Sequence, residues 1–122
     1  MKTKDEILNS LAHCTGSEQY HKYMMGLILT DGTKLFAELC QCFWLLDILA
    51  SVQRNKKVVG EDFQVLNIKR NGDKAVVTVE DGNNNVLYKQ NIPYTDFPLD
   101  DYKLFAVAQG NGMRVVMLPS EY

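Results

Sequence analysis

The stretch FQVLNIKRNGDKAVVTVE, residues 63–80, decides the fold that we expect for this chain. Apolar and polar residues alternate on both sides of Asn71-Gly72, and a period of two is typical of strands with one buried face. Asn-Gly is a strong signal for a type I′ hairpin, because that turn needs positive φ at both central residues. The stretch therefore predicts two antiparallel strands, 63–70 and 75–80, joined by a tight turn.

The same alternation continues toward the end of the chain and predicts three more strands. They are expected at 86–92, 102–108 and 113–118, with a proline-containing loop at 93–101. The 102–108 segment is apolar on both faces, which favours a central place in the sheet.

The first half of the chain shows the three-to-four-residue spacing of helices instead. We expect a short helix at 4–12 and a longer one at 33–54, whose N-terminus Asp31 can cap. The Cys40-Gln41-Cys42 segment can divide the longer helix in two. Its second half, FWLLDILA, is apolar nearly all round, so we expect a covered helix in the centre of the core.

Helices followed by strands predict an α+β domain. The apolar segment 23–30 should be a strand of the same sheet, because a lone strand leaves its backbone groups unpaired. We expect N-terminal helices packed on an antiparallel β-meander of about five to six strands. A length of 122 residues with 46% hydrophobic residues suits a single domain, 1–122.

Charge and cysteine content narrow the classes of function. A net charge of −2 lacks the basic footprint of a nucleic-acid-binding protein, so no nucleic-acid partner is expected. Cys14, Cys40 and Cys42 are an odd number, which favours free thiols in a reducing cytoplasm over a disulfide framework. The charged N-terminus, beginning at Lys2, does not resemble a signal peptide, and no apolar stretch is long enough to span a membrane.

Five phrases distributed along the chain resemble one family of small, uncharacterised bacterial proteins. They are TGSEQY at 15–20, TDG at 30–32, WLLDILAS at 44–51, YTDFPL at 94–99 and LPSEY at 118–122. The resemblance implies a self-contained intracellular domain. Because such proteins also occur on phages and plasmids, it suggests a role in mobile-element biology or phage–host interaction. It implies no catalytic residue.

The stretch HCTGSEQYHKY at 13–23 concentrates polar side chains and has three interpretations. Thr15 and Glu18 fit the S/T-x-x-E capping box, with Ser17 in the first turn and Tyr20 packed at the edge of the core. Alternatively, His13, His21 and the three cysteines could bind zinc, although their spacing departs from the standard ligand pairs. Cys14 could also be a nucleophile paired with one of the histidines. We expect no metal and no cofactor.

Asp47 is a carboxylate in the apolar helix segment. If that helix is buried, Asp47 must be hydrogen-bonded, paired or protonated. It is therefore either a satisfied structural link or a pocket carboxylate with a raised pKa.

Acidic residues also gather in and after the 93–101 loop. Asp96 is expected to form an Asx-turn before Phe97. Together with Asp100, Asp101 and Glu121 it could line an acidic rim that holds magnesium or calcium, although no EF-hand spacing is present.

These patterns favour a small cytoplasmic binding or regulatory module over an enzyme. Its partner would be a protein or a small ligand, and it could form a homodimer. We expect the 15–20 turn, the 94–101 loop and the C-terminal tail to share one surface. The candidate binding residues are Thr15, Ser17, Glu18, Tyr20, Asp47, Asp96, Phe97 and Glu121. The alternative is a small hydrolase-like enzyme with Asp47 as its pocket carboxylate and His21 or Glu18 as its acid–base group.

Overall fold

The computed structural model describes residues 3–122, so Lys2 lies outside the described part. The helices are α1 (Lys4–Ala12), α2 (Asp31–Cys40), α3 (Phe43–Val52) and α4 (Lys56–Val59), with 3-10 turns η1 (Met24–Gly26) and η2 (Pro119–Glu121). The strands are β1 (Tyr20–Lys22), β2 (Leu27–Thr30), β3 (Phe63–Asn71), β4 (Lys74–Asp81), β5 (Val86–Ile92), β6 (Asp101–Ala108) and β7 (Arg114–Met117). The α+β class is therefore confirmed.

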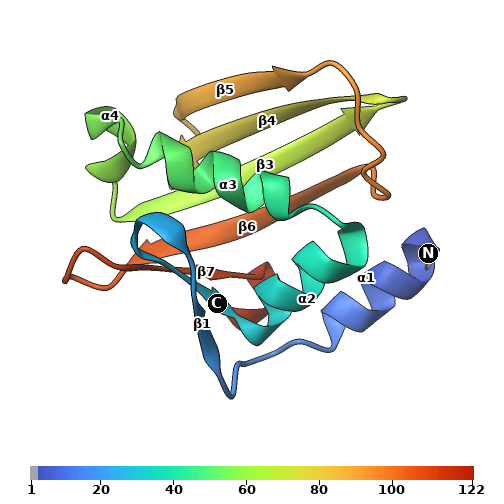
Figure 1. Ribbon diagram of the computed structural model, residues 1–122, viewed down its shortest axis with the longest axis horizontal. Coiled ribbons are helices and arrows are strands. Elements are labelled where there is room, and N and C mark those ends of the chain that lie inside the picture. Colours follow the sequence, from blue (N-terminus) through green and yellow to red (C-terminus); the bar gives the residue numbers. More distant parts are fainter. Residues whose placement is uncertain (1–2) are drawn as a thin grey trace.

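Across residues 3–122 one seven-stranded sheet forms, in the order β1-β2-β7-β6-β3-β4-β5 (Figure 1). The expected antiparallel meander of five to six strands is only roughly right, because β2 and β7 pair in parallel. The β5–β6 connection also returns the chain so that β6 pairs with β3 and not with β5. The apolar strand β6 accordingly lies in the middle of the sheet, as its two-sided hydrophobicity predicted.

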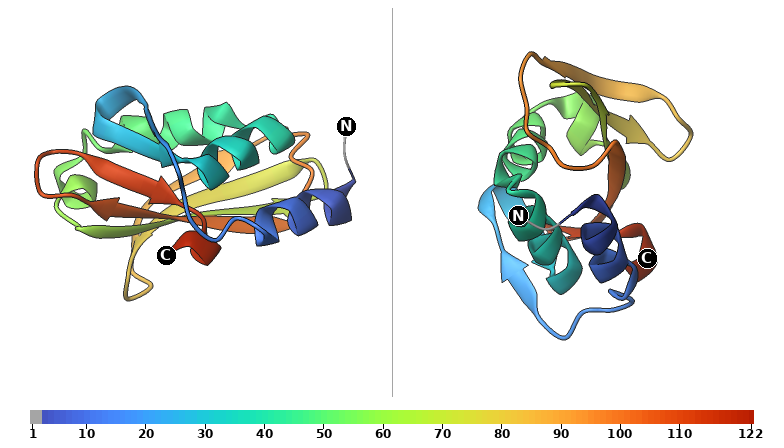
Figure 2. Two further views of the ribbon diagram at one scale, coloured as in Figure 1. Left: turned by 90° about the horizontal axis from the view of Figure 1, so that it is seen from below. Right: turned by 90° about the vertical axis from the view of Figure 1, so that its right-hand side faces the viewer.

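Helices α2 and α3 lie together on one side of the sheet, and the chain turns between them at Gln41, whose φ is 52° (Figure 2). The predicted break at Cys40-Gln41-Cys42 is thus confirmed. The expectation that this helix is covered on most sides is only partly right, since Phe43 is 38% exposed and Asp47 is exposed. The helix covers the sheet with one face and presents the other to solvent. No helix in residues 3–122 is long and apolar enough to cross a membrane.

Two N-terminal predictions need correction. The strand expected at 23–30 begins only at Leu27, because Met25 and Gly26 adopt positive φ in the turn of a β1–β2 hairpin. The capping box expected at Thr15 and Glu18 is wrong, since no helix begins there. The capping box lies at the start of α1, where Thr3 and Glu6 exchange hydrogen bonds (3.2 Å each).

The β3–β4 hairpin forms with a turn shifted by one residue. Asn71 pairs with Lys74, so Gly72 and Asp73 are the two loop residues. Gly72 has a φ of 66°, whereas Asn71 does not have positive φ. Glycine at the first central position is the pattern of a type II′ turn, so the type I′ prediction at Asn71-Gly72 is wrong.

The alternation of side chains gives β3 and β6 two different faces. Leu66 and Leu104, which are opposite each other in register, are 1% exposed beneath the helices. Phe63, Val65 and Phe105 have the other parity and are partly exposed on the far side. We call the far side of β3, β4, β6 and β7 the open face.

Candidate functional site

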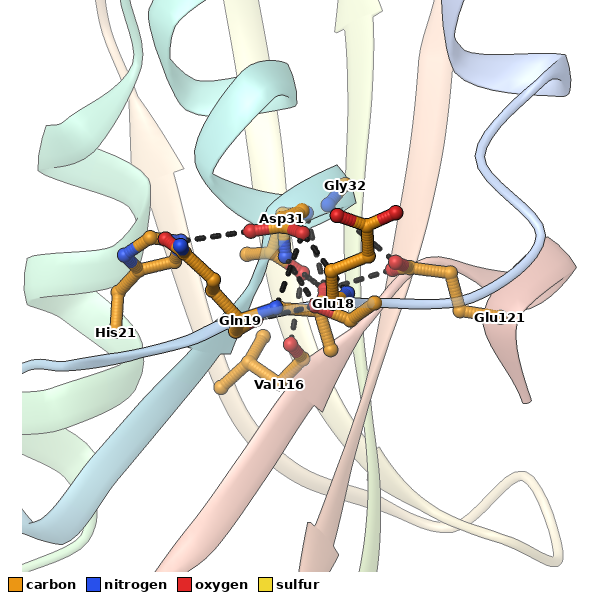
Figure 3. Close-up of polar contacts among 10 residues, drawn as sticks. Glu18, Gln19, His21, Asp31, Gly32, Val116 and Glu121 are labelled. Atoms are coloured by element: carbon orange, nitrogen blue, oxygen red, sulfur yellow. Dashed lines mark hydrogen bonds and ion pairs between the residues drawn. The ribbon is translucent and has the colours of Figure 1, made fainter.

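A polar cluster surrounds the first turn of α2 and consists of Ser17, Thr30, Asp31, Gly32 and Glu121 (Figure 3). We call it the Asp31–Glu121 cluster. Thr30 is the N-cap, because its Oγ1 accepts a hydrogen bond from the backbone N–H of Thr33 (3.1 Å). The prediction that Asp31 caps this helix is therefore wrong by one residue, which leaves the Asp31 carboxylate free for other partners.

The carboxylate of Asp31 ties the preceding loop to the helix. Its Oδ2 accepts the backbone N–H groups of Glu18 (3.0 Å) and Gln19 (3.2 Å), and its Oδ1 lies 2.8 Å from His21 Nε2. The hydrogen bond with His21 and then the two backbone donors hold the pKa of Asp31 below its usual value. The backbone N–H of Asp31 in turn donates to Ser17 Oγ (2.9 Å).

The carboxylate of Glu121 ties the C-terminal tail to the same helix turn. It accepts hydrogen bonds from Thr30 Oγ1 (2.7 Å), the Leu118 N–H (2.9 Å) and the Gly32 N–H (3.3 Å). A Cβ at Gly32 would lie 2.7 Å from Glu121 Oε1, so this approach requires glycine. A carboxylate at this position also complements the positive end of the helix dipole.

Three of the phrases that carry the family resemblance therefore meet in one place, at 15–20, 30–32 and 118–122. Both oxygens of Asp31 and both oxygens of Glu121 already accept hydrogen bonds from this chain. The Asp31–Glu121 cluster therefore fixes the N-terminal loop and the C-terminal tail onto α2, and in this role we call it the latch.

Asp47 lies on the exposed side of α3, so the expectation of a buried carboxylate is wrong. Its Oδ1 accepts a hydrogen bond from the hydroxyl of Tyr23. Partial burial and this hydrogen bond raise the pKa of Tyr23 to about 12. Tyr23 also stacks on Phe43, with ring centroids 6.4 Å apart. Asp47 thus fixes an aromatic pair at the protein surface.

The 94–101 loop is mostly anchored in the protein. Phe97 is 3% exposed and packs edge-on against Phe36 in the core, so its ring is not available to a partner. The Phe97 N–H donates to Thr95 Oγ1 (3.1 Å), so Thr95, and not the exposed Asp96, forms the turn. Asp100 pairs with Lys4 and with Arg70.

Neither metal hypothesis gains support from the side-chain positions. No group of three or more His, Cys, Asp or Glu side chains that could hold a metal ion occurs in residues 3–122. Cys14, Cys40 and Cys42 are free thiols. Burial raises the pKa of Cys14, and the neighbouring Cys40 and burial raise that of Cys42, which disfavours the reactive thiolate.

The 15–20 turn, the C-terminal tail and the 94–101 loop do not share one surface, because the first two lie at one end of α1 and the loop at the other. The 15–20 turn and the tail are close, as the hydrogen bond from Ser120 Oγ to the Cys14 carbonyl (2.6 Å) shows. The 94–101 loop contacts the opposite end of α1 through Lys4 and Asp100. A helix of nine residues separates these ends by about 14 Å. Tyr20 lies apart on the edge strand β1 and is 60% exposed, and Thr15 is exposed.

The sequence pattern did not indicate the aromatic side chains on the open face as a candidate site. Phe63 and Phe105 lie on neighbouring strands with ring centroids 5.2 Å apart. Tyr122 packs edge-on against both rings, at 5.4 and 5.3 Å, and is itself 74% exposed. Their parity within each strand was visible in the sequence, but their contact depends on the β3–β6 register.

A hollow of about 420 Å³ lies on the open face beside these rings. Its lining consists of Phe63, Val65, Asn67, Lys69, Glu80, Asp81, Gly82, Asn84, Lys103 and Phe105. Lys103 Nζ is 5.7 Å from the centroid of the Phe105 ring. Within residues 3–122, neither Lys69 nor Lys103 has a carboxylate oxygen within 4.0 Å. Aromatic surface and lysines without an ion-pair partner therefore occur together in this hollow.

The protein is thus an α+β domain whose mixed sheet is covered by α2 and α3 on one side and has the hollow on the other. The chain belongs to the Family of unknown function (DUF6876), whose model matches residues 5–122. This match confirms the expected membership of an uncharacterised family. A solved structure described as the protein of unknown function from Enterococcus faecalis is similar, with a TM-score of 0.57 and 17% identity over 80% of this chain and 91% of that chain. At this identity the likeness concerns the fold alone. The comparison with curated proteins finds no match.

Proposed function

We propose that this protein is a binding module that recognises its partner on the open face of the sheet. The observation that carries the proposal is the hollow in which Phe63 and Phe105 lie beside the ammonium groups of Lys69 and Lys103, neither of which forms an ion pair within residues 3–122. Exposed aromatic rings are enriched at recognition surfaces. The expected cytoplasmic location and the link to mobile elements belong to the same proposal and are supported by the family resemblance.

The residues of the enzyme alternative lie with separate partners. Asp47 accepts from Tyr23, whereas His21 pairs with Asp31. Glu18 is exposed, and its backbone N–H contributes to the latch. Acid–base catalysis needs such groups within hydrogen-bond reach of one reacting atom. The hydrolase-like function therefore stays an alternative prediction, and the binding module is the function that we favour.

Lysine footprinting in living cells tests the proposal without knowledge of the partner. Cells that produce the protein, and the purified protein at low concentration, are treated with the same membrane-permeant amine-reactive reagent. The modified fraction of each lysine is then measured by mass spectrometry. We expect Lys69 and Lys103 to be several-fold less modified in cells. Lys34, which is exposed on α2, is the matched control and should react equally in both samples.

Equal modification of Lys69 and Lys103 in cells and in the purified protein would refute a partner on the open face. Protection that appears equally at Lys34 would also count against the proposal, because it would report a general effect of the cell on lysine reactivity. Protection in the purified protein that grows with its concentration would identify a second copy of this chain as the partner.

A further inference from the structure

We propose that the hollow on the open face binds a small anion that contains one aromatic or heteroaromatic ring and one phosphate or carboxylate group. The inference rests on the proposed function and names the ligand of the same face. At about 420 Å³ the hollow falls within the range of about 300–1,000 Å³ that is usual for small-molecule sites.

The aromatic part of the hollow suits a planar ring. Phe63 and Phe105 are tilted by 48° to each other at 5.2 Å and are both partly exposed. Tyr122, which is not among the lining residues, packs edge-on against both rings and restrains their orientation. A ligand ring can therefore stack on this preorganised surface once the flexible Lys103 side chain, whose ammonium lies over the Phe105 ring, moves to its anionic group.

The cationic part lies directly beside these rings. Lys103 is two residues from Phe105 on β6, and its ammonium group is 5.7 Å from the ring centroid. Lys69 lies on the adjacent strand β3, two residues beyond Asn67, which is directly opposite Lys103. Lys69 and Lys103 are therefore diagonal neighbours on the open face. Asp101 is opposite Lys69 in that register, yet no ion pair within 4.0 Å joins them in residues 3–122. An anionic group attached to a stacked ring would meet both lysines.

The acidic part selects a small ligand over a nucleic-acid strand. Glu80 Oε2 accepts hydrogen bonds from Asn67 Nδ2 (2.6 Å) and Thr78 Oγ1 (3.2 Å), which orient the carboxylate. Its Oε1 accepts no hydrogen bond from residues 3–122, so it can accept an N–H of the ligand ring. With Glu80 and Asp81 the lining holds two carboxylates and two lysines, so it can accept one anionic group beside the lysines but not the successive phosphates of a polymer. The net charge of −2 also disfavours a polyanion.

Binding is tested by ¹H–¹⁵N NMR titration of the whole chain with two probes. Adenosine 5′-monophosphate supplies a phosphate and anthranilate supplies a carboxylate, so the two titrations distinguish the two anionic groups. Adenosine lacks the anion, and inorganic phosphate lacks the ring. We expect saturable shifts at Phe63, Lys103 and Phe105 with at least one probe. Its affinity should exceed that of adenosine and that of inorganic phosphate by about tenfold or more.

Variants then assign the binding to the hollow. Lys103→Ala should weaken the binding of the active probe by about tenfold, because it removes a charge-assisted contact. Lys89→Ala is the matched control, since Lys89 is exposed on β5, opposite Thr78, and does not line the hollow. Phe105→Leu should also weaken binding, because it removes the ring while keeping an apolar side chain. The unfolding midpoint of each variant verifies that it is folded.

Three results would overturn the inference. The first is that neither probe causes saturable shifts. The second is that Lys103→Ala and Lys89→Ala bind the active probe equally. The third is that a single-stranded oligonucleotide binds far more tightly than either probe. The last result would assign the face to nucleic acid. If the probes fail while Lys69 and Lys103 remain protected in cells, the inference is wrong and the proposed function stands.

Discussion

The close approach of Gly32 to Glu121 leads to a quantitative prediction about the latch. In Gly32→Ala, the new Cβ would lie 2.7–2.8 Å from the carboxylate atoms of Glu121, so the carboxylate must move away. Its three hydrogen bonds, of 2.7, 2.9 and 3.3 Å, would then be lengthened, and the loss of all three sets the upper limit of the effect. Hydrogen bonds to charged groups contribute about 1.5–3 kcal/mol each. Because Glu121 is half-buried and one bond is long, we expect the whole set to contribute about 2–3 kcal/mol.

Alanine itself favours the helix over glycine by about 0.5–1 kcal/mol. Gly32→Ala should therefore lower the free energy of unfolding by at most about 1–2.5 kcal/mol, and Glu121→Ala by about 2–3 kcal/mol. In the Glu121→Ala background, however, the same glycine substitution should stabilise the protein by about 0.5–1 kcal/mol, since nothing is left to displace. The coupling energy of the double-mutant cycle is then at most about 2–3 kcal/mol.

Urea unfolding followed by the fluorescence of Trp44 measures all four proteins of the cycle. We expect shifted midpoints with an unchanged dependence of the free energy on urea concentration. If Gly32→Ala costs the same free energy with and without the Glu121 carboxylate, the contact is not the reason for the glycine, and the latch argument fails.

Three further predictions concern other polar contacts. The lowered pKa of Asp31 stabilises the folded state above the unfolded pKa of about 3.9. That contribution should disappear as the pH falls through the lower folded pKa, and Asp31→Asn should reduce the loss seen in acid unfolding curves. The phenol of Tyr23 should ionise near a pKa of about 12, and Asp47→Asn should lower this value in an ultraviolet titration. Gln64→Ala should destabilise the protein by about 2–3 kcal/mol, because it leaves the buried amide of Gln53 and the Val58 carbonyl without their partner.

Each of these has a contrary outcome. Identical acid unfolding of the wild type and Asp31→Asn would show that the carboxylate makes no net contribution. A tyrosine titration that Asp47→Asn leaves unchanged would remove Asp47 as a cause of the shift. A cost below about 0.5 kcal/mol for Gln64→Ala would mean that the buried amides are satisfied in another way.

The strands of the second half could be predicted because their signal is local. Strand β5 has the bounds expected from its alternation, and the ends of β3, β4 and β6 differ by one residue. The position of β6 in the middle of the sheet also followed from its composition. The break before α3 was visible in the same way, as a polar interruption of a helical pattern.

The parallel pairing of β2 with β7 could not be predicted in this way. Leu29 and Val116 are paired across most of the chain, and local periodicity does not specify which distant strand supplies the missing hydrogen bonds. The burial of Asp47 was predicted wrongly for a related reason. An apolar helix segment shows how much of its surface is hydrophobic but not which side the sheet will cover.

The sequence by itself determined the kinds of chemical group that this protein uses. It singled out Ser17, Glu18, Asp31 and Glu121, and it determined which side chains of each strand share a face. Only the tertiary structure decided that Glu121 reaches the amide of Gly32, and that Phe63 and Phe105 form one surface beside two lysines. Side-chain identity and parity are local properties of the chain. Contacts between residues some 40 to 90 positions apart depend on strand order and register, which form only when the whole core packs.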